Sequence, residues 1–227
     1  MQELRDSGYL SAAVRNYVAL LGWGPGDDET LLDTAELVAR FRPEDVGRSS
    51  AVFDEKKLRW MNGRYMRELD LDEYTAAVAA FNGREPDAEL RLACSIAREK
   101  AQTLAEVWPL IRFLFEQPID DEKAWRKTMK QHAPGALEAV REALAAIDGF
   151  DVASVEAAME PIPAKLDLKP GKVYQPVRVA LTGTTVSPGI FESVAALGRE
   201  RSLARIDVAL ARLAASPPAP AAPAGDG

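Results

Sequence analysis

Apolar residues recur along this chain at intervals of three and four, the spacing that places side chains on one face of an α-helix. Leu10, Val14, Tyr17 and Leu21 form one such stripe, and similar stripes run over residues 90–104 and 203–213. The alternation typical of a β-strand is confined to residues 177–179. The pattern therefore predicts an all-α protein.

Polar residues that can cap helices stand before several of these stripes. Asp54 has the place of an N-cap, and so does Ser187, which is followed by Pro188 at a position where proline starts helices well. In a capping box, the N-cap side chain and a Glu three residues later each bond the other's backbone N–H. Three pairs have that spacing: Asp33 with Glu36, Asp70 with Glu73, and Thr103 with Glu106.

Charge is unevenly distributed over the 227 residues. The formal net charge is -7, which excludes a protein that binds nucleic acid or membranes through a global positive charge. Residues 165–212 nevertheless carry 8 Lys and Arg against 4 Asp and Glu, and residues 84–130 carry 9 of each. These two segments are the candidates for contact with an anionic partner.

Few side chains are available for catalysis or metal binding. The single cysteine, Cys94, excludes an intrachain disulfide, and the single histidine, His132, excludes a multi-histidine metal site. Cys94 lies on an apolar stripe and is predicted to be packed, while His132 is placed near the end of a helix. The four tryptophans are predicted to be packing anchors. A Walker phosphate loop is absent from the sequence, and from the residues alone the chain is a soluble helical protein.

Three motifs resemble bacterial glutamyl-tRNA synthetases. They are GYLSAAVRNYVALLGW at 8–23, VFDEKKLRWMNGRYMR at 52–67, and QPVRVALTG at 175–183, the last followed by SPGIF at 187–191 and LGRER at 197–201. Their order and spacing match the family over about residues 3–213. Ser11 and Ala12 stand where the family usually has Pro-Glu, and Ser11 is expected to serve as the helix cap there.

The resemblance implies successive helical bundles of the anticodon-binding type. Residues 1–69 would be the end of a stem-contact domain. Residues 70–145 would be a first anticodon-binding bundle and residues 146–214 a second, with a disordered Pro/Ala-rich tail at 215–227. The family's HIGH-type and KMSKS-type motifs do not occur in this sequence. We therefore expect this chain alone to be inactive in aminoacylation and to need no cofactor, since ATP and Mg²⁺ belong to the catalytic domain.

The resemblance also implies a partner and a set of contact residues. The partner would be the anticodon arm of tRNA(Glu), in the cytoplasm, with a synthetase catalytic domain as a second partner and neither DNA nor a membrane involved. Lys100 stands where the family has an arginine that helps read the anticodon. The predicted RNA-binding residues are Arg91, Arg98, Lys100, Arg178, Thr182, Arg199, Arg201 and Arg205.

Two other interpretations remain open on the sequence. The chain could be a detached synthetase module that binds a protein as a scaffold or regulator. It could also be a fragment of an ordinary glutamate–tRNA ligase. For any single arginine named above, a solvated helix face with surface ion pairs is the simpler interpretation.

Overall fold

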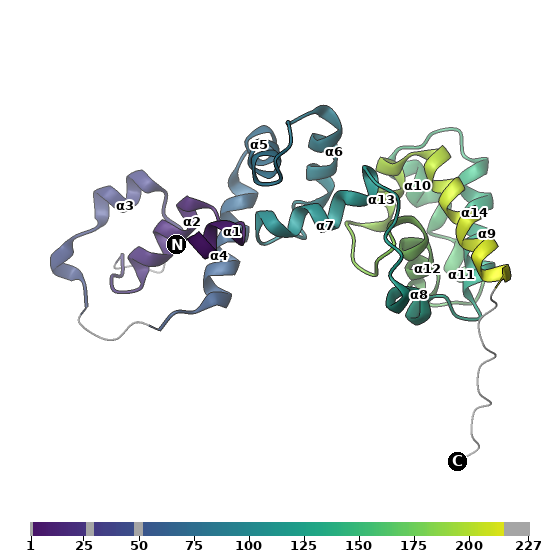
Figure 1. The fold of residues 1–227 in the computed structure, drawn as a ribbon, viewed down its shortest axis with the longest axis horizontal. Helices are drawn as coiled ribbons and strands as arrows, with labels where there is room; N and C mark the ends of the chain where they lie inside the picture. The colour runs from purple at the N-terminus through teal and green to yellow at the C-terminus, as the bar shows by residue number, and fades with distance from the viewer. Residues whose placement is uncertain (1, 26–29, 48–51, 216–227) are drawn as a thin grey trace, which may run out of the picture. The chain divides into compact units, whose positions relative to one another are not determined.

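The computed structural model describes residues 2–25, 30–47 and 52–215, and all the regular structure in them is helical (Figure 1). The predicted all-α fold is thus confirmed. The chain divides into two compact units, residues 1–109 and residues 110–227. Within the described parts, none of the helices has the length and apolar character needed to cross a membrane.

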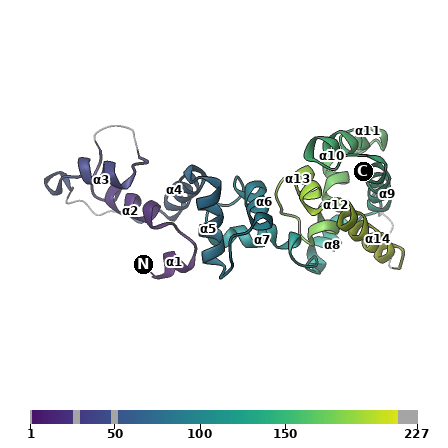
Figure 2. The ribbon, with the colours of Figure 1, turned by 90° about the horizontal axis from the view of Figure 1, so that it is seen from above.

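Unit 1 is built around α4, the longest of its helices. Tyr17 and Val14 of α2 pack with Leu58 and Met61 of α4 in a common core. The helices and turns of this unit are α1 (Gln2–Asp6), α2 (Ser11–Leu20), α3 (Thr34–Arg40), η1 (Pro43–Asp45), α4 (Glu55–Glu68), α5 (Leu71–Phe81), α6 (Ala88–Ala97) and η2 (Leu104–Glu106). α5 and α6 lie against one another, as the turned view also shows (Figure 2). α7 (Val107–Ile111) follows η2.

One buried side chain ties three segments of unit 1 together. The Asn62 amide oxygen accepts a hydrogen bond from Leu10 N–H at 2.7 Å, and its nitrogen donates to the Gln102 carbonyl at 2.6 Å. Nearby, Leu104 N–H donates to the Gly8 carbonyl, where glycine has φ +80° and its Cα lies against the backbone of the 104–105 turn. The start of α2, the middle of α4 and the 102–105 segment are therefore held as one piece.

Unit 2 centres on three helices that lie side by side: α9 (Ala133–Ala146), α12 (Pro170–Thr182) and α14 (Arg199–Ala215) (Figure 1). Leu137, Leu144, Val177, Leu181 and Ile206 are buried among them. The remaining elements are η3 (Arg112–Leu114), α8 (Glu122–Thr128), α10 (Val152–Met159), α11 (Ile162–Lys165) and α13 (Ile190–Leu197).

Two residues shape α12, one at its end and one inside it. Gly183 stops the helix in the left-handed region with φ +77°, and the 117–121 segment passes so close that a Cβ there would overlap the Ile119 backbone. Pro176 lies inside the helix and has no N–H, so the Lys172 carbonyl lacks its helical hydrogen bond. α12 thus has one internal backbone hydrogen bond fewer than a helix without proline.

Three of the six predicted helix caps agree with the structure. The capping boxes at Asp33 and Asp70 are confirmed, with both side chains accepting from the third helical N–H and both glutamates returning the bond. Asp54 is confirmed as the cap of α4. Cys94 is fully buried, as predicted, and burial raises the pKa of its thiol to about 11.

Three predicted caps are wrong. Thr103 makes no cap bond, because Glu106 instead accepts from Gln102 N–H and pairs with Arg59 of α4. Ser187 does not begin α13, which starts at Ile190 after Gly189. Ser11 is the first residue of α2, and the N-cap position belongs to Leu10.

The predicted three-part division stays a prediction. The boundary at 69/70 falls inside unit 1 and that at 145/146 inside unit 2, where α9 packs on both α10 and α14. Residues 216–227 of the predicted disordered tail lie outside the described residues.

Candidate nucleic-acid interface

The arginine of the QPVR motif, Arg178, holds the turn that follows α12. Arg178 donates from its guanidinium to the Ser187 hydroxyl and, at 2.7 Å, to the Pro188 carbonyl. Burial lowers the pKa of Arg178 below its ordinary value. Thr182, also buried, donates to the Arg178 carbonyl at 2.8 Å and accepts from Thr184 N–H at 3.2 Å. These two residues shape the 183–189 turn.

The three predicted arginines of α14 face backbone carbonyl groups. Arg199 donates to the Leu144, Ala145, Ile147 and Asp148 carbonyls, which end α9. Arg201 donates to Leu197 at 2.8 Å and Leu114 at 2.6 Å. Arg205 donates to Leu181 at 2.6 Å and Glu116 at 2.9 Å, and burial lowers its pKa to about 10. Their guanidinium groups therefore join segments of unit 2, and RNA contact by them stays a prediction.

Of the three predicted RNA-binding residues in unit 1, two already contact other groups of the chain and one does not. Arg98 donates to the Met66, Arg67 and Leu69 carbonyls at the end of α4. Arg91 pairs with Asp72 at 2.5 Å on the surface. Lys100 is exposed and makes no ion pair with another described residue. Of these three, Lys100 is the one whose charge is open to a ligand.

A cationic cavity lies on unit 2, at the beginnings of two helices. It has a volume of about 450 Å³ and is lined by Lys127, Thr128, His132, Gly171, Lys172, Gln175, Pro176 and Thr185. His132 precedes α9, and Gly171 is in the first turn of α12; neither helix start has a side-chain cap bond. The positive ends of both helix dipoles therefore add to the charge of the lysines. We call this the α9/α12 cavity.

The electrostatics of the α9/α12 cavity favour an anion. Lys127 and Lys172 are exposed, and the lining contains no Asp or Glu. Burial first, and then the Lys172 charge, lower the pKa of His132 below its ordinary value. Gln175 and Thr185 add hydrogen-bonding side chains of the kind that read base edges.

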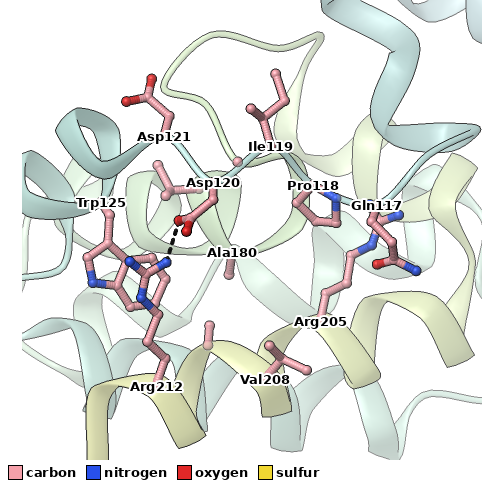
Figure 3. A pocket seen from close by; sticks show the side chains of 13 residues that line it. Gln117, Pro118, Ile119, Asp120, Asp121, Trp125, Ala180, Arg205, Val208 and Arg212 are labelled. Carbon is pink, nitrogen blue, oxygen red and sulfur yellow. Dashed lines mark hydrogen bonds and ion pairs between the residues drawn. The ribbon is translucent and has the colours of Figure 1, made fainter. Parts of the chain in front are cut away.

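A second pocket of unit 2 is lined by an arginine whose charge is already neutralised by carboxylates (Figure 3). It has a volume of about 260 Å³ and lies between the 117–121 segment, α12 and α14. Arg212 stacks on the Trp125 ring, 4.0 Å from its centroid, and pairs with Asp120 at 2.7 Å (Figure 3). Because Arg212 also pairs with Glu122, its cation is not free for a phosphate.

Comparison with known proteins places these features in a family. The anticodon binding domain family matches residues 53–210. This chain belongs to that family. The match spans α4 to α14 and includes every residue of the α9/α12 cavity.

Curated relatives found in the comparisons are ligases. The chain is 41% identical to a glutamate–tRNA ligase of Thermobifida fusca and 40% identical to one of Salinispora tropica. These matches cover 95% and 94% of this chain, but 48% and 49% of the relatives, so the chain spans about half their length. The resemblance seen in the sequence is confirmed.

A solved structure shares the fold. The glutamate–tRNA ligase of Elizabethkingia meningosepticum, in complex with its amino acid, matches 92% of this chain and 43% of its own with a TM-score of 0.78 and 26% identity. The helical bundles of this chain therefore have the same fold as the matching part of that ligase.

Sequence reasoning missed the two lysines and the histidine of the α9/α12 cavity. Lys127, His132 and Lys172 come from three separated segments, and His132 was expected near a helix end whereas it precedes α9. The available signal was the excess of positive charge over residues 165–212, to which Lys172 belongs. The prediction that all four tryptophans are packing anchors is wrong for Trp60, which is 48% exposed.

Proposed function

We propose that this chain is the carboxy-terminal, tRNA-binding part of a glutamate–tRNA ligase, acting in the cytoplasm, and that unit 2 takes the anticodon arm of tRNA(Glu). The observation that carries the proposal is the α9/α12 cavity, which lies inside the family match and is lined by cations without a carboxylate. RNA loops are recognised through phosphate contacts together with hydrogen bonds to unstacked bases. The cavity offers groups of both kinds.

In this proposal the chain binds the tRNA and positions its anticodon loop. Lys127, Lys172 and the two helix starts would attract the backbone of the loop, while Gln175 and Thr185 would contact bases. The 183–189 turn is held by Arg178, so that Thr185 is presented from a fixed support. The relatives reported above are ligases and give no support to a scaffold or regulator.

The other half of the ligase would be the second partner. An apolar groove of about 740 Å³ runs along α1 and α2 and is lined by Leu4, Tyr9, Leu10, Val14 and Val18 among others. Val18 is 51% exposed. Since the relatives are about twice as long as this chain, we propose that a catalytic half packs on this groove.

The RNA proposal is tested by binding of labelled tRNA(Glu), followed by fluorescence anisotropy from about 50 mM to about 200 mM salt. The K127Q/K172Q variant should bind at least about tenfold more weakly at low salt, with a salt slope that is smaller by about 1.4. The K123Q/K165Q variant removes two exposed lysines outside the cavity and should bind like the wild type. Equal affinity of all three proteins would overturn the assignment of the cavity.

A further inference from the structure

The second pocket of unit 2 has an apolar strip along one helix. Residues three and four apart share one face of a helix, and the residues of α14 that line the pocket have that spacing: Arg205, Val208, Ala209 and Arg212 (Figure 3). Val208 is 70% exposed, and Ile119 on the opposite wall is 39% exposed. The apolar lining is completed by Pro118, Val179 and Ala180. We call this the α12/α14 pocket.

The walls of the α12/α14 pocket are held in place by backbone contacts. A Cβ on Gly183 would overlap the Ile119 backbone, so the 117–121 segment packs directly on the end of α12. The Asp121 carboxylate accepts from the N–H groups of Lys123 and Ala124, each at 2.9 Å, and fixes the same segment to α8. A pocket whose walls are already ordered loses little conformational entropy when a ligand binds.

The cations of the α12/α14 pocket are already bound within the chain. Arg212 stacks on Trp125 and pairs with Asp120 and Glu122. Arg205 donates to two backbone carbonyl groups. The pocket therefore favours an uncharged, apolar ligand over a phosphate, and the Trp125 indole gives it an aromatic wall.

Residues 216–227, which lie outside the described residues, follow α14 directly and have the composition of such a ligand. Pro217, Pro220 and Pro223 recur at every third position, and residues 216–225 contain no charged side chain. A polyproline II helix has three residues per turn, so prolines with this spacing share one edge of it. Segments of this kind bind to grooves that are lined by aromatic side chains.

The length of this segment suits the pocket. Arg205 and Arg212 are about 10 Å apart along the axis of α14, and Pro220 and Pro223 would be about 9 Å apart in a polyproline II helix. The five residues from Ala215 to Pro220 can span up to about 17 Å, whereas Arg212 lies only about 4.5 Å back along the helix axis. The chain can therefore turn back after α14 and reach the whole strip.

We propose that the α12/α14 pocket binds a proline-rich segment in the polyproline II conformation, and that its occupant is residues 216–227 of the same chain. In this arrangement Pro220 packs beside Trp125 and Pro223 against Val208. The contact removes the exposed side chains of Val208 and Ile119 from water. The family match ends at residue 210, before this segment, and the contact requires no RNA.

The contact is tested in the full chain with a bimane label, whose emission is quenched on contact with tryptophan. The label is attached to an Ala221→Cys variant, next to Pro220, and the fully buried Cys94 does not compete for the reagent. Trp125 is the only tryptophan in the sequence of unit 2, so Trp125→Phe gives the unquenched reference. Emission is measured without tRNA, together with the thermal unfolding midpoint.

Two pairs of variants in the labelled chain, each a test with a matched control, change the segment or the pocket. The first pair introduces two serines three positions apart, on the proline edge or on another edge of the polyproline II helix. The second pair introduces one carboxylate at an exposed position of α14, inside or outside the pocket. The variants are P220S/P223S with its control A219S/A222S, and V208D with its control A211D. The midpoints should agree, because none of these changes touches the buried core.

We expect the emission of the labelled chain to be at least about twofold lower than that of its Trp125→Phe form, since a docked population of about half or more is quenched. P220S/P223S and V208D should raise the emission to the unquenched level, and both controls should stay quenched. Equal emission with and without Trp125, or equal recovery in tests and controls, would overturn the inference. Quenching that increases with protein concentration would also overturn it, because a second copy would then supply the occupant.

Discussion

The side-chain nitrogen of Asn62 donates a hydrogen bond of 2.6 Å to the carbonyl oxygen of Gln102, forty residues further along the chain. The same side chain accepts from Leu10 N–H, and Asn62 is fully buried. Its removal would leave two part-buried backbone groups, the Leu10 N–H and the Gln102 carbonyl, without this partner.

Asn62→Ala is therefore expected to lower the free energy of unfolding by about 2 to 4 kcal/mol. Urea denaturation followed by circular dichroism measures it. The matched control is Ser95→Ala, which removes an exposed hydroxyl on α6 and should change stability by less than about 0.5 kcal/mol. If Asn62→Ala were as stable as this control, the side chain would not tie the three segments together.

Arg205 provides a second stability test, in unit 2. It joins the Leu181 carbonyl at the end of α12 to the Glu116 carbonyl, and its charge is half-buried. We expect Arg205→Ala to lower the free energy of unfolding by about 2 to 4 kcal/mol, whereas Arg126→Ala, which breaks an exposed ion pair with Glu122, should cost less than about 0.5 kcal/mol. Unchanged stability together with lost tRNA affinity would instead assign Arg205 to RNA contact.

Cys94 makes the free energy of unfolding decrease with rising pH in the alkaline range. Burial raises the pKa of its thiol from 9.0 to about 11, so the native state holds the proton more tightly than the unfolded chain. The stabilisation is fully present below pH 9.0 and is lost as the pH rises toward 11, at up to about 1.4 kcal/mol per pH unit. Urea unfolding at a series of pH values should show this fall, and Cys94→Ala should reduce it. Since burial also raises the pKa of Tyr65 to about 12, part of the fall should persist in that variant.

The lowered pKa of His132 predicts that RNA affinity increases as the pH falls into the mildly acidic range. Its pKa lies below the ordinary 6.5 in the free protein, and a bound phosphate would favour the protonated ring. Affinity for tRNA should thus increase severalfold from about pH 7.5 to about pH 5.5. Anisotropy titrations measure the effect, and His132→Gln should abolish it. The same pH dependence in His132→Gln would exclude the imidazole as its source.

This 227-residue chain, purified without a host synthetase, should not exchange pyrophosphate into ATP in the presence of glutamate. The reason is that its sequence has neither of the two motifs with which this class of synthetase stabilises the phosphates of ATP. The radiochemical exchange assay measures the activity directly. Exchange above the level of a mock purification would contradict the expectation.

Features that depend on neighbours in sequence were predictable, and those that depend on distant segments were not. The boxes at Asp33 and Asp70 follow from residues three positions apart, so the sequence contains the whole interaction. The Thr103 box has the same spacing, but Arg59 lies 47 residues away and binds Glu106 in the folded chain. A local pattern cannot reveal such competition.

The same distinction between local and distant contacts explains which residues of the candidate site could be predicted from the sequence. Arg201 and Arg205 were predicted as RNA contacts from the family resemblance and the positive charge of their segment. Their carbonyl partners Leu114 and Glu116 lie 87 and 89 residues earlier in the chain. Lys127 and Lys172 approach one another only because α8 packs on α12. Charge composition identified the segment, and tertiary packing decided which of its cations remain open.

Two glycines at opposite ends of α12 have opposite tolerance for substitution. At Gly183 the chain is in the left-handed region and the Ile119 backbone occupies the place of a Cβ, so every other residue would push the 117–121 segment away. At Gly171 no atom lies within 4 Å of a Cβ, and many side chains would fit. The end of this helix is therefore fixed by its backbone neighbours, while its beginning, at the α9/α12 cavity, is free to vary and could be altered in an engineered protein to retune which RNA it prefers.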